Sequence, residues 1–132
     1  MIRYVDTSAA LKLVIDERES SDLAADLTRS AADGHTLLAS MLLYTELHCA
    51  ARRRDEMDAP AVNAVLDGLT LVDLERGDLV RAASSAWGLR STDAIHLAVA
   101  LRLQADEMVG YDDELLRAAE QAGVSVCSPG SS

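Results

Sequence analysis

The sequence predicts an α/β fold in which a parallel sheet of four to five strands lies between two layers of helices. Short apolar segments alternate with longer segments of helical periodicity along the 132 residues. This is the order expected of a parallel sheet with helical crossovers. The short segments also lack a polar face, as is typical of strands that are covered on both sides. We therefore expect a three-layer α/β/α sandwich.

The expected strands are short apolar runs bounded by polar or turn residues. They are residues 2–5, 36–40, 69–74, 108–111 and 124–127. The first run ends abruptly at Asp6, which the hydroxyl residues Thr7 and Ser8 follow. This order places a carboxylate at the carboxyl edge of a strand, where open α/β sheets build their sites.

The expected helices fill the intervals between the strands. They are residues 8–16, 18–33, 41–54, 58–67, 91–104 and 112–122, with one more that Asp78 caps and Gly88 ends. Pro60 suits a first helical turn, and Gly34, Gly68 and Gly123 suit helix ends. The helix over 8–16 is apolar nearly all round, so it needs a second cover, either from a partner chain or from another helix of the same chain.

Length and composition indicate one domain, residues 1–128, followed by a flexible tail over 129–132. No apolar run is as long as a membrane span and the N-terminus lacks a signal-type segment, so we expect a cytoplasmic protein. A net charge of −10 argues against a general nucleic-acid coat protein and favours a basic protein partner. Cys49 and Cys127 fit no zinc spacing and are interpreted as small core residues.

Acidic residues stand at four places that a parallel sheet could bring together: Asp6, Glu46, Asp93 and Asp112. Each aspartate alone could simply cap a helix or favour its dipole. Glu46 lies in the apolar start of a helix, where a carboxylate is costly unless it is paired or binds metal. Asp6 and Asp112 directly follow strands, and strand ends of one kind share an edge of a parallel sheet.

Carboxylates gathered in one pocket repel each other, by roughly 4 kcal/mol for a pair at ~4 Å near a protein surface. Such a site takes up protons or holds a hard cation, and oxygen ligands suit Mg²⁺ or Mn²⁺. Such an ion is bound through one or two carboxylates, with water and substrate phosphate completing its shell. We therefore interpret the four acids as a metal site for phosphodiester hydrolysis.

Four motifs carry a resemblance to a known family. VDTSA around Asp6, YTELHCA around Glu46, STDAIHLA around Asp93 and GYDDELLRAA around Asp112 resemble the PIN-domain ribonucleases. The short length and the DTSA start are most similar to VapC toxins of bacterial toxin–antitoxin pairs, and the resemblance covers residues 1–128. It implies a PIN-like fold and a metal-dependent endoribonuclease whose catalytic and metal-binding residues are those four acids. On this resemblance the metal would be held chiefly by Asp6 and Asp93, with Glu46 and Asp112 binding directly or through water, and a bound water of lowered pKa would attack phosphorus. It also implies a cognate VapB-like antitoxin and a homodimer.

Several roles stay open at this point. The fourth acid is Asp112 or its neighbour Asp113, and Asp112 is preferred because it directly follows the strand. His96 could reach a metal or be a satisfied core group. Ser8 and Thr7 could orient a carboxylate or a metal-bound water, or could bond to the helix start.

Arginines offer candidate contacts to RNA phosphates, at Arg52–Arg54 and at Arg90, although a solvated helix end also explains the triple arginine. The alternative to an enzyme is a non-catalytic domain of the same fold whose acids bind a basic peptide.

Overall fold

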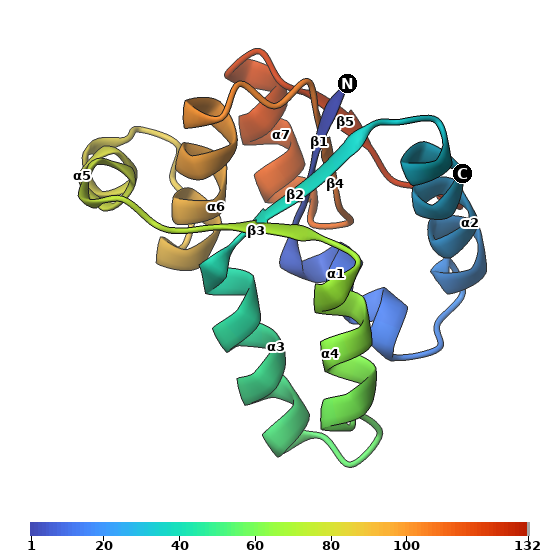
Figure 1. Cartoon of the computed structure of the whole chain (residues 1–132). Helices are drawn as coiled ribbons and strands as arrows, with labels where there is room; N and C mark the ends of the chain where they lie inside the picture. Colours follow the sequence, from blue (N-terminus) through green and yellow to red (C-terminus); the bar gives the residue numbers. More distant parts are fainter. Residues whose placement is uncertain (132) are drawn as a thin grey trace.

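The computed structural model describes residues 1–131 of the chain. Its strands form one parallel sheet in the order β3-β2-β1-β4-β5 (Figure 1). The strands are β1 (Ile2–Val5), β2 (Thr36–Ser40), β3 (Thr70–Val72), β4 (Glu107–Val109) and β5 (Ser125–Cys127). From β1 the chain moves outward to β3 and then crosses to β4 on the other side. The carboxyl ends of β1 and β4 therefore meet where the strand order reverses, which is where such sheets bind ligands.

The helices alternate with the strands as predicted. They are α1 (Thr7–Val14), α2 (Ser20–Ala32), α3 (Met41–Arg53), α4 (Ala59–Asp67), α5 (Arg76–Ser84), α6 (Ser91–Arg102) and α7 (Asp113–Gln121). None of the helices within residues 1–131 is long and apolar enough to cross a membrane.

Side chains alternate between the two faces of the sheet and build a core on each side. Tyr4 and Met108 pack with the helices α6 and α7. Val5 and Val109, one position further along the same strands, pack with α1 and α2. This period of two residues is what buries both faces, and it confirms the predicted three-layer α/β/α sandwich.

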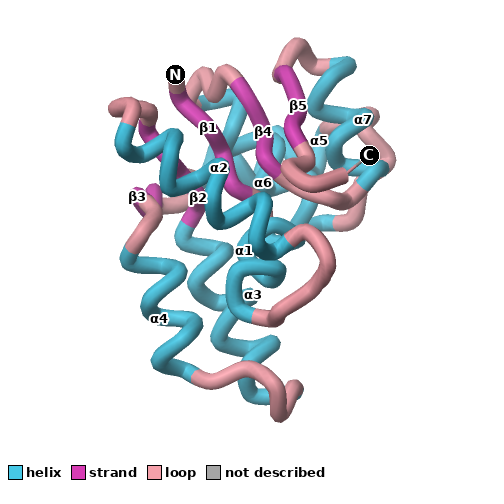
Figure 2. Tube along the Cα trace, turned by 90° about the vertical axis from the view of Figure 1, so that its right-hand side faces the viewer, coloured by secondary structure: helices cyan, strands magenta, loops and turns pink. Residues whose placement is uncertain are grey.

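Helices α3 and α4 run side by side and project beyond the carboxyl end of the sheet (Figures 1 and 2). Their facing side chains form a further apolar cluster that includes Leu43, Leu47 and Val62, together with Ala10 of α1. α1 is thus covered by α2, α3 and α4 of its own chain. The second cover that this helix needs therefore comes mostly from helices of the same chain and not from a partner chain. Leu13 of α1 still lines an open groove.

The start and end of α5 differ from the prediction. Asp78 does not cap this helix from outside; Glu75 is the N-cap residue, and Asp78 lies in the first turn. The Asp78 side chain accepts a hydrogen bond from the Glu75 backbone N–H at 2.9 Å and pairs with Arg102 of α6. The helix ends at Ser84, before Trp87, so the tryptophan lies in the loop that leads to α6.

The cysteines were also placed wrongly by the sequence interpretation. Cys49 is exposed on α3 and Cys127 is only partly buried, so neither is a core residue. Near the C-terminus, the carbonyl oxygen of Pro129 accepts a hydrogen bond of 2.6 Å from the Tyr111 hydroxyl. The flexible tail expected over 129–132 includes Ser132, which lies outside the described residues, and its flexibility stays a prediction.

Candidate active site

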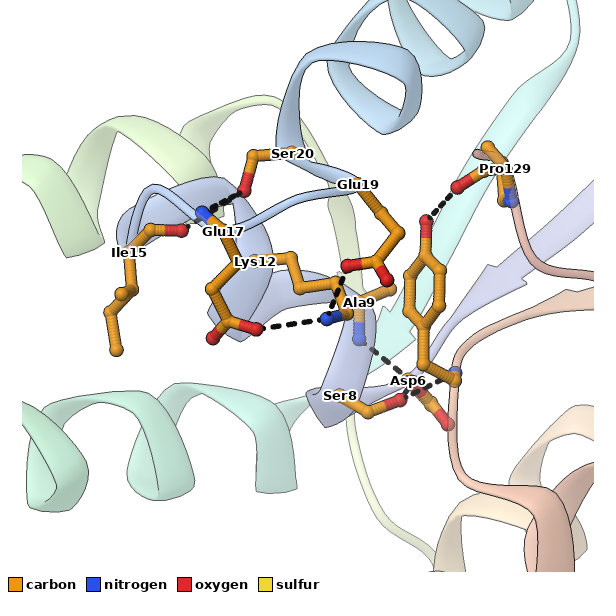
Figure 3. Close-up of polar contacts among 10 residues, drawn as sticks. Asp6, Ser8, Ala9, Lys12, Ile15, Glu17, Glu19, Ser20 and Pro129 are labelled. Atoms are coloured by element: carbon orange, nitrogen blue, oxygen red, sulfur yellow. Dashed lines mark hydrogen bonds and ion pairs between the residues drawn. The ribbon is translucent and has the colours of Figure 1, made fainter. Parts of the chain in front are cut away.

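Asp6 occupies the position directly after β1, at the point where the strand order reverses. Its side chain is 1% exposed. Oδ1 accepts hydrogen bonds from the Ser8 hydroxyl at 2.6 Å and from the Ala9 backbone N–H at 3.0 Å (Figure 3). Oδ2 is buried and has no hydrogen-bond partner within residues 1–131. A buried carboxylate oxygen without a donor is costly, so this atom needs a ligand that the described chain does not supply.

Gly110, the residue after β4, forms the floor beneath this carboxylate. A Cβ at Gly110 would come within 2.6 Å of the Asp6 carboxyl carbon. Real Cβ contacts are not this short, so only glycine leaves room for Asp6 in its observed place. Ser8 closes the same junction, because its hydroxyl also accepts the backbone N–H of Tyr111 at 2.8 Å. The end of β4 is thereby fixed against the start of α1.

Burial is the main cause that raises the pKa of the Asp6 carboxyl from 3.8 to about 6, and the hydrogen bonds from Ser8 and Ala9 offset it only in part. The pKa of Asp93 is raised as well, first by burial and then by the negative charge of Asp112. The negative charge of Asp93 helps to raise the pKa of Asp6, and the negative charge of Glu46 helps to raise the pKa of Asp93. The predicted acids therefore lie close enough to repel one another, as carboxylates that share a site do.

Glu46 is held by a hydrogen-bonded network that connects three segments of the chain. Its Oε1 accepts a bond of 2.8 Å from the Thr7 hydroxyl and lies 2.6 Å from His96 Nε2. His96 Nδ1 lies 2.6 Å from the hydroxyl of Tyr4 in β1, and that hydroxyl accepts the Ser40 backbone N–H at 3.3 Å. His96 is 1% exposed and its hydrogen-bonding groups are satisfied. It is therefore a buried partner of Glu46 in this structure.

Asp112 caps α7, and its Oδ1 accepts the backbone N–H groups of Glu114 and Leu115 at 3.0 and 3.2 Å. Asp112 and Asp93 line one polar hollow of about 260 Å³, together with Asp113, Glu114 and Arg90. Asp112 is half-buried and Asp113 is exposed. The charge of Asp112 raises the pKa of Asp93, which favours Asp112 over Asp113 as the fourth acid.

No three His, Cys, Asp or Glu side chains within residues 1–131 lie close enough together to hold a metal ion jointly. In each of Asp6, Glu46 and Asp112, one carboxylate oxygen accepts hydrogen bonds from protein donors. The donor set nevertheless fits a hard cation, because every predicted ligand offers carboxylate oxygen and Asp6 Oδ2 has no other partner among the described residues. The assignment of Asp6, Glu46, Asp93 and Asp112 as metal ligands stays a prediction.

Two residues of the site, Gly110 and Tyr4, were not identified from the sequence. Gly110 has a recognisable signal, since a glycine between an apolar strand and an acid indicates a close approach of another group. Tyr4 had none, because a tyrosine in an apolar strand is typical of the core. The alternatives for His96 were metal ligand or core group, and the link to Glu46 was not among them.

The comparison with protein families matches residues 3–121 to the PIN domain. Among curated proteins, the chain is 34% identical to the ribonuclease VapC47 of Mycobacterium tuberculosis over 131 residues. It is 36% identical to the ribonuclease VapC35 of the same organism over 137 residues. Each comparison covers 96% of this chain and 96% of the relative.

The fold also matches a solved structure, that of VapBC2 from Rickettsia felis bound to a DNA fragment from the promoter. The TM-score is 0.71 at 13% sequence identity, and the match covers 96% of this chain and 97% of the other. At this identity the likeness shows the fold alone.

Proposed function

The chain belongs to the PIN-domain family, among the VapC ribonucleases, and from this membership and the geometry of the site we propose that it is a metal-dependent endoribonuclease. It would act in the cytoplasm as the toxin of a toxin–antitoxin pair. The observation that carries the proposal is the buried carboxylate of Asp6, whose Oδ2 lacks a partner within residues 1–131 at the reversal of strand order. A structural aspartate at this depth would have a donor for each oxygen.

Mg²⁺ or Mn²⁺ would be held by Asp6 and Asp93, with Glu46 and Asp112 binding directly or through water. When bound, the metal supplies charge for the phosphate and activates water. The chain's own residues prepare the site: Ser8 fixes the orientation of Asp6, and Thr7 that of Glu46. The burial of Asp6 also keeps bulk water away from its carboxylate.

Arg90 is the residue that we propose contacts an RNA phosphate next to the acids. It is exposed and lines the same hollow as Asp93 and Asp112. Its guanidinium can bind a phosphate in a bidentate manner, without reading sequence. The Arg90→Gln variant is expected to raise KM for RNA more than it lowers kcat.

The test of the activity uses purified protein without any partner, Mn²⁺ or Mg²⁺, and a structured RNA. We expect cleavage that disappears with chelator and in the Asp6→Asn and Asp93→Asn variants, while circular dichroism shows that both variants are folded. If both variants cleave as fast as the wild type, the site assignment is wrong. If the wild type is inert but binds a basic peptide, the non-catalytic alternative is favoured.

The partner that we propose is a VapB-like antitoxin, whose helix or extended arm would lie in an apolar groove between α1, α2 and α4. The groove has a volume of about 560 Å³ and is lined by Leu13, Ala24, Leu27, Ala61, Ala64 and Val65, among others. The alanines let a helix approach closely, which is the helix-in-groove mode of recognition. The net charge of −10 suits a partner with basic side chains that reach toward the acids.

A matched pair of variants tests this groove, with a VapB-like antitoxin as the probe. Ala24 lines the groove and its neighbour Ala25 does not, and both are exposed on α2. We expect Ala24→Arg to abolish co-purification and Ala25→Arg to leave it intact. Equal co-purification of both variants would place the partner elsewhere.

A homodimer is the second association that we propose. Leu79 and Val80 are 46% and 57% exposed on α5. A second copy of the chain that covers this face would remove apolar surface from water. Sedimentation should give a dimer for the wild type and a monomer for Val80→Glu.

A further inference from the structure

A directed chain of hydrogen bonds runs from the end of β2 to Glu46. The Ser40 backbone N–H can only donate, so the Tyr4 oxygen accepts it at 3.3 Å. The Tyr4 hydroxyl hydrogen then needs an acceptor, and His96 Nδ1 lies 2.6 Å away. A ring nitrogen that accepts carries no proton, so the ring proton lies on Nε2. Nε2–H in turn donates to Glu46 Oε1 at 2.6 Å.

The same contacts exclude hydrogen bonds that run in the opposite direction, with the ring proton of His96 on Nδ1. A proton on Nδ1 would make the Tyr4 oxygen accept from both His96 and Ser40. The hydroxyl hydrogen of Tyr4 would then have no acceptor, although Tyr4 is 0% exposed. Such an unsatisfied buried donor costs about 1–3 kcal/mol. The contacts therefore select one tautomer of the imidazole.

The consequence for Glu46 is a difference between its two oxygens. Thr7 and His96 both donate to Oε1, and within residues 1–131 no hydrogen bond engages Oε2. The Thr7 oxygen also lies 3.1 Å from His96 Nε2, so the three groups form a closed triangle. With Oε1 fixed in this way, Oε2 is the oxygen left for a ligand.

We propose that His96 is a positioning residue: Tyr4 and Glu46 together fix its ring proton on Nε2, and His96 with Thr7 holds Glu46 by Oε1 and leaves Oε2 for the cation. This role rests on the proposed function, in which Glu46 is a metal ligand. It differs from the two roles considered from the sequence, since His96 is neither a ligand itself nor an idle core residue. Hydrogen bonds to ligating groups from outside the metal shell typically change metal affinity or activity on the order of 10–100-fold.

The tautomer is tested on the metal-free protein by long-range ¹H–¹⁵N NMR correlation of the histidine rings. We expect the His96 ring to show a protonated Nε2 and a bare Nδ1. In the Tyr4→Phe variant Nδ1 loses its hydrogen-bond donor, so its ¹⁵N chemical shift should move to that of an unbonded ring nitrogen, while Glu46 still holds the proton on Nε2. A proton on Nδ1 of the wild type, or an unchanged Nδ1 chemical shift in Tyr4→Phe, overturns the proposal.

The positioning role is tested by two variants that each keep a single amide. The amide nitrogen of His96→Gln can reach the place of Nε2, whereas that of His96→Asn reaches only the place of Nδ1. We expect His96→Asn to lower Mn²⁺ affinity in calorimetry on the order of 10-fold, and His96→Gln to restore most of it. In the cleavage assay kcat should follow the same order, with KM for RNA unchanged.

The control is His35→Gln, which alters a histidine whose Nδ1 contacts the N-terminal amine. It should leave Mn²⁺ affinity and cleavage at wild-type values. Equal losses of affinity in His96→Gln and His96→Asn, at equal stability by urea unfolding, would show a merely structural role and overturn the proposal. If the wild type does not cleave RNA, the proposed function fails, while the NMR and calorimetry results still decide this inference.

Discussion

Two aspartates in this molecule are almost fully buried, Asp6 at 1% and Asp78 at 3% exposed, and their surroundings are opposite. Burial would raise the pKa of Asp78, but the hydrogen bonds from Arg102 at 2.9 Å and from the Glu75 backbone outweigh it and lower the pKa. Asp6 forms no ion pair with lysine or arginine in the described chain, and its pKa rises to about 6. The carboxylate of Asp78 stabilises the fold, whereas that of Asp6 destabilises it, which is typical of a functional group.

The largest expected effect separates the two residues by activity. Asp6→Asn should reduce cleavage on the order of 10³-fold, because several kcal/mol of metal-borne stabilisation are lost. Asp78→Asn should cleave at the wild-type rate at 20 °C, since Asp78 lies on α5 and not among the predicted ligands. Initial rates on one RNA measure both. A large loss of cleavage in a fully folded Asp78→Asn variant would show that the two aspartates do not differ in function.

The next effect concerns stability, and here the substitution of Asp78 is the harmful one. Asp78→Asn should lower the free energy of unfolding by about 2–3 kcal/mol, less than for a fully buried pair because Arg102 is partly exposed. The measurement is the urea midpoint, with the m-value as the check that the unfolding remains comparable. Asp73→Asn is the control, since Asp73 contacts the same arginine only through its backbone oxygen. A shift of that size in Asp73→Asn would contradict the role of the ion pair.

A third effect tests the glycine beneath Asp6. Gly110→Ala should destabilise the fold by about 1–3 kcal/mol, because its Cβ meets the Asp6 carboxylate, which is fixed by hydrogen bonds. In an Asp6→Ala background the same change should cost much less, since the clashing atoms are gone. A double-mutant cycle of urea midpoints measures this coupling. Additive effects of the two changes would mean that Gly110 is required for another reason.

The smallest effect is a gain in stability and depends on pH. The raised pKa means that folded Asp6 binds its proton more tightly than unfolded Asp6 does, so stability falls as pH rises from about 4 to about 6. A shift from 3.8 to about 6 corresponds to about 3 kcal/mol at most. Asp6→Asn should therefore raise stability by about 1–2 kcal/mol at pH 7.5, and the gain should shrink toward pH 4.

Asp78→Asn should show the opposite dependence. The lowered pKa of Asp78 gives stability that is present above its ordinary value of 3.8 and is lost as pH falls further. The deficit of Asp78→Asn should persist at pH 4.5 and shrink only in stronger acid. Thermal unfolding at several pH values measures both variants. Parallel curves for Asp6→Asn and Asp78→Asn would show that the two carboxylates do not differ in the stated way.

The layers of the fold were predictable because they depend on local patterns. Apolar runs without a polar face predict buried parallel strands, and acids directly after such runs predict a site at one edge. What the sequence did not predict depends on distant partners. Asp78 reads locally as a cap, but it pairs with Arg102, which is 24 positions away. Tyr4 and His96 are 92 positions apart, and no local pattern joins them.

The order of the strands also has a consequence for timing. The acids proposed to act on RNA come from segments that follow β1, β2, β3 and β4 in turn, and they span the chain from Asp6 to Asp112. Gly110, which supports Asp6, is added to the growing polypeptide more than a hundred residues after it. A partly synthesised chain that stops before Gly110 therefore lacks both the support of Asp6 and one of the proposed ligands, so the proposed site forms only after β4 has folded against β1.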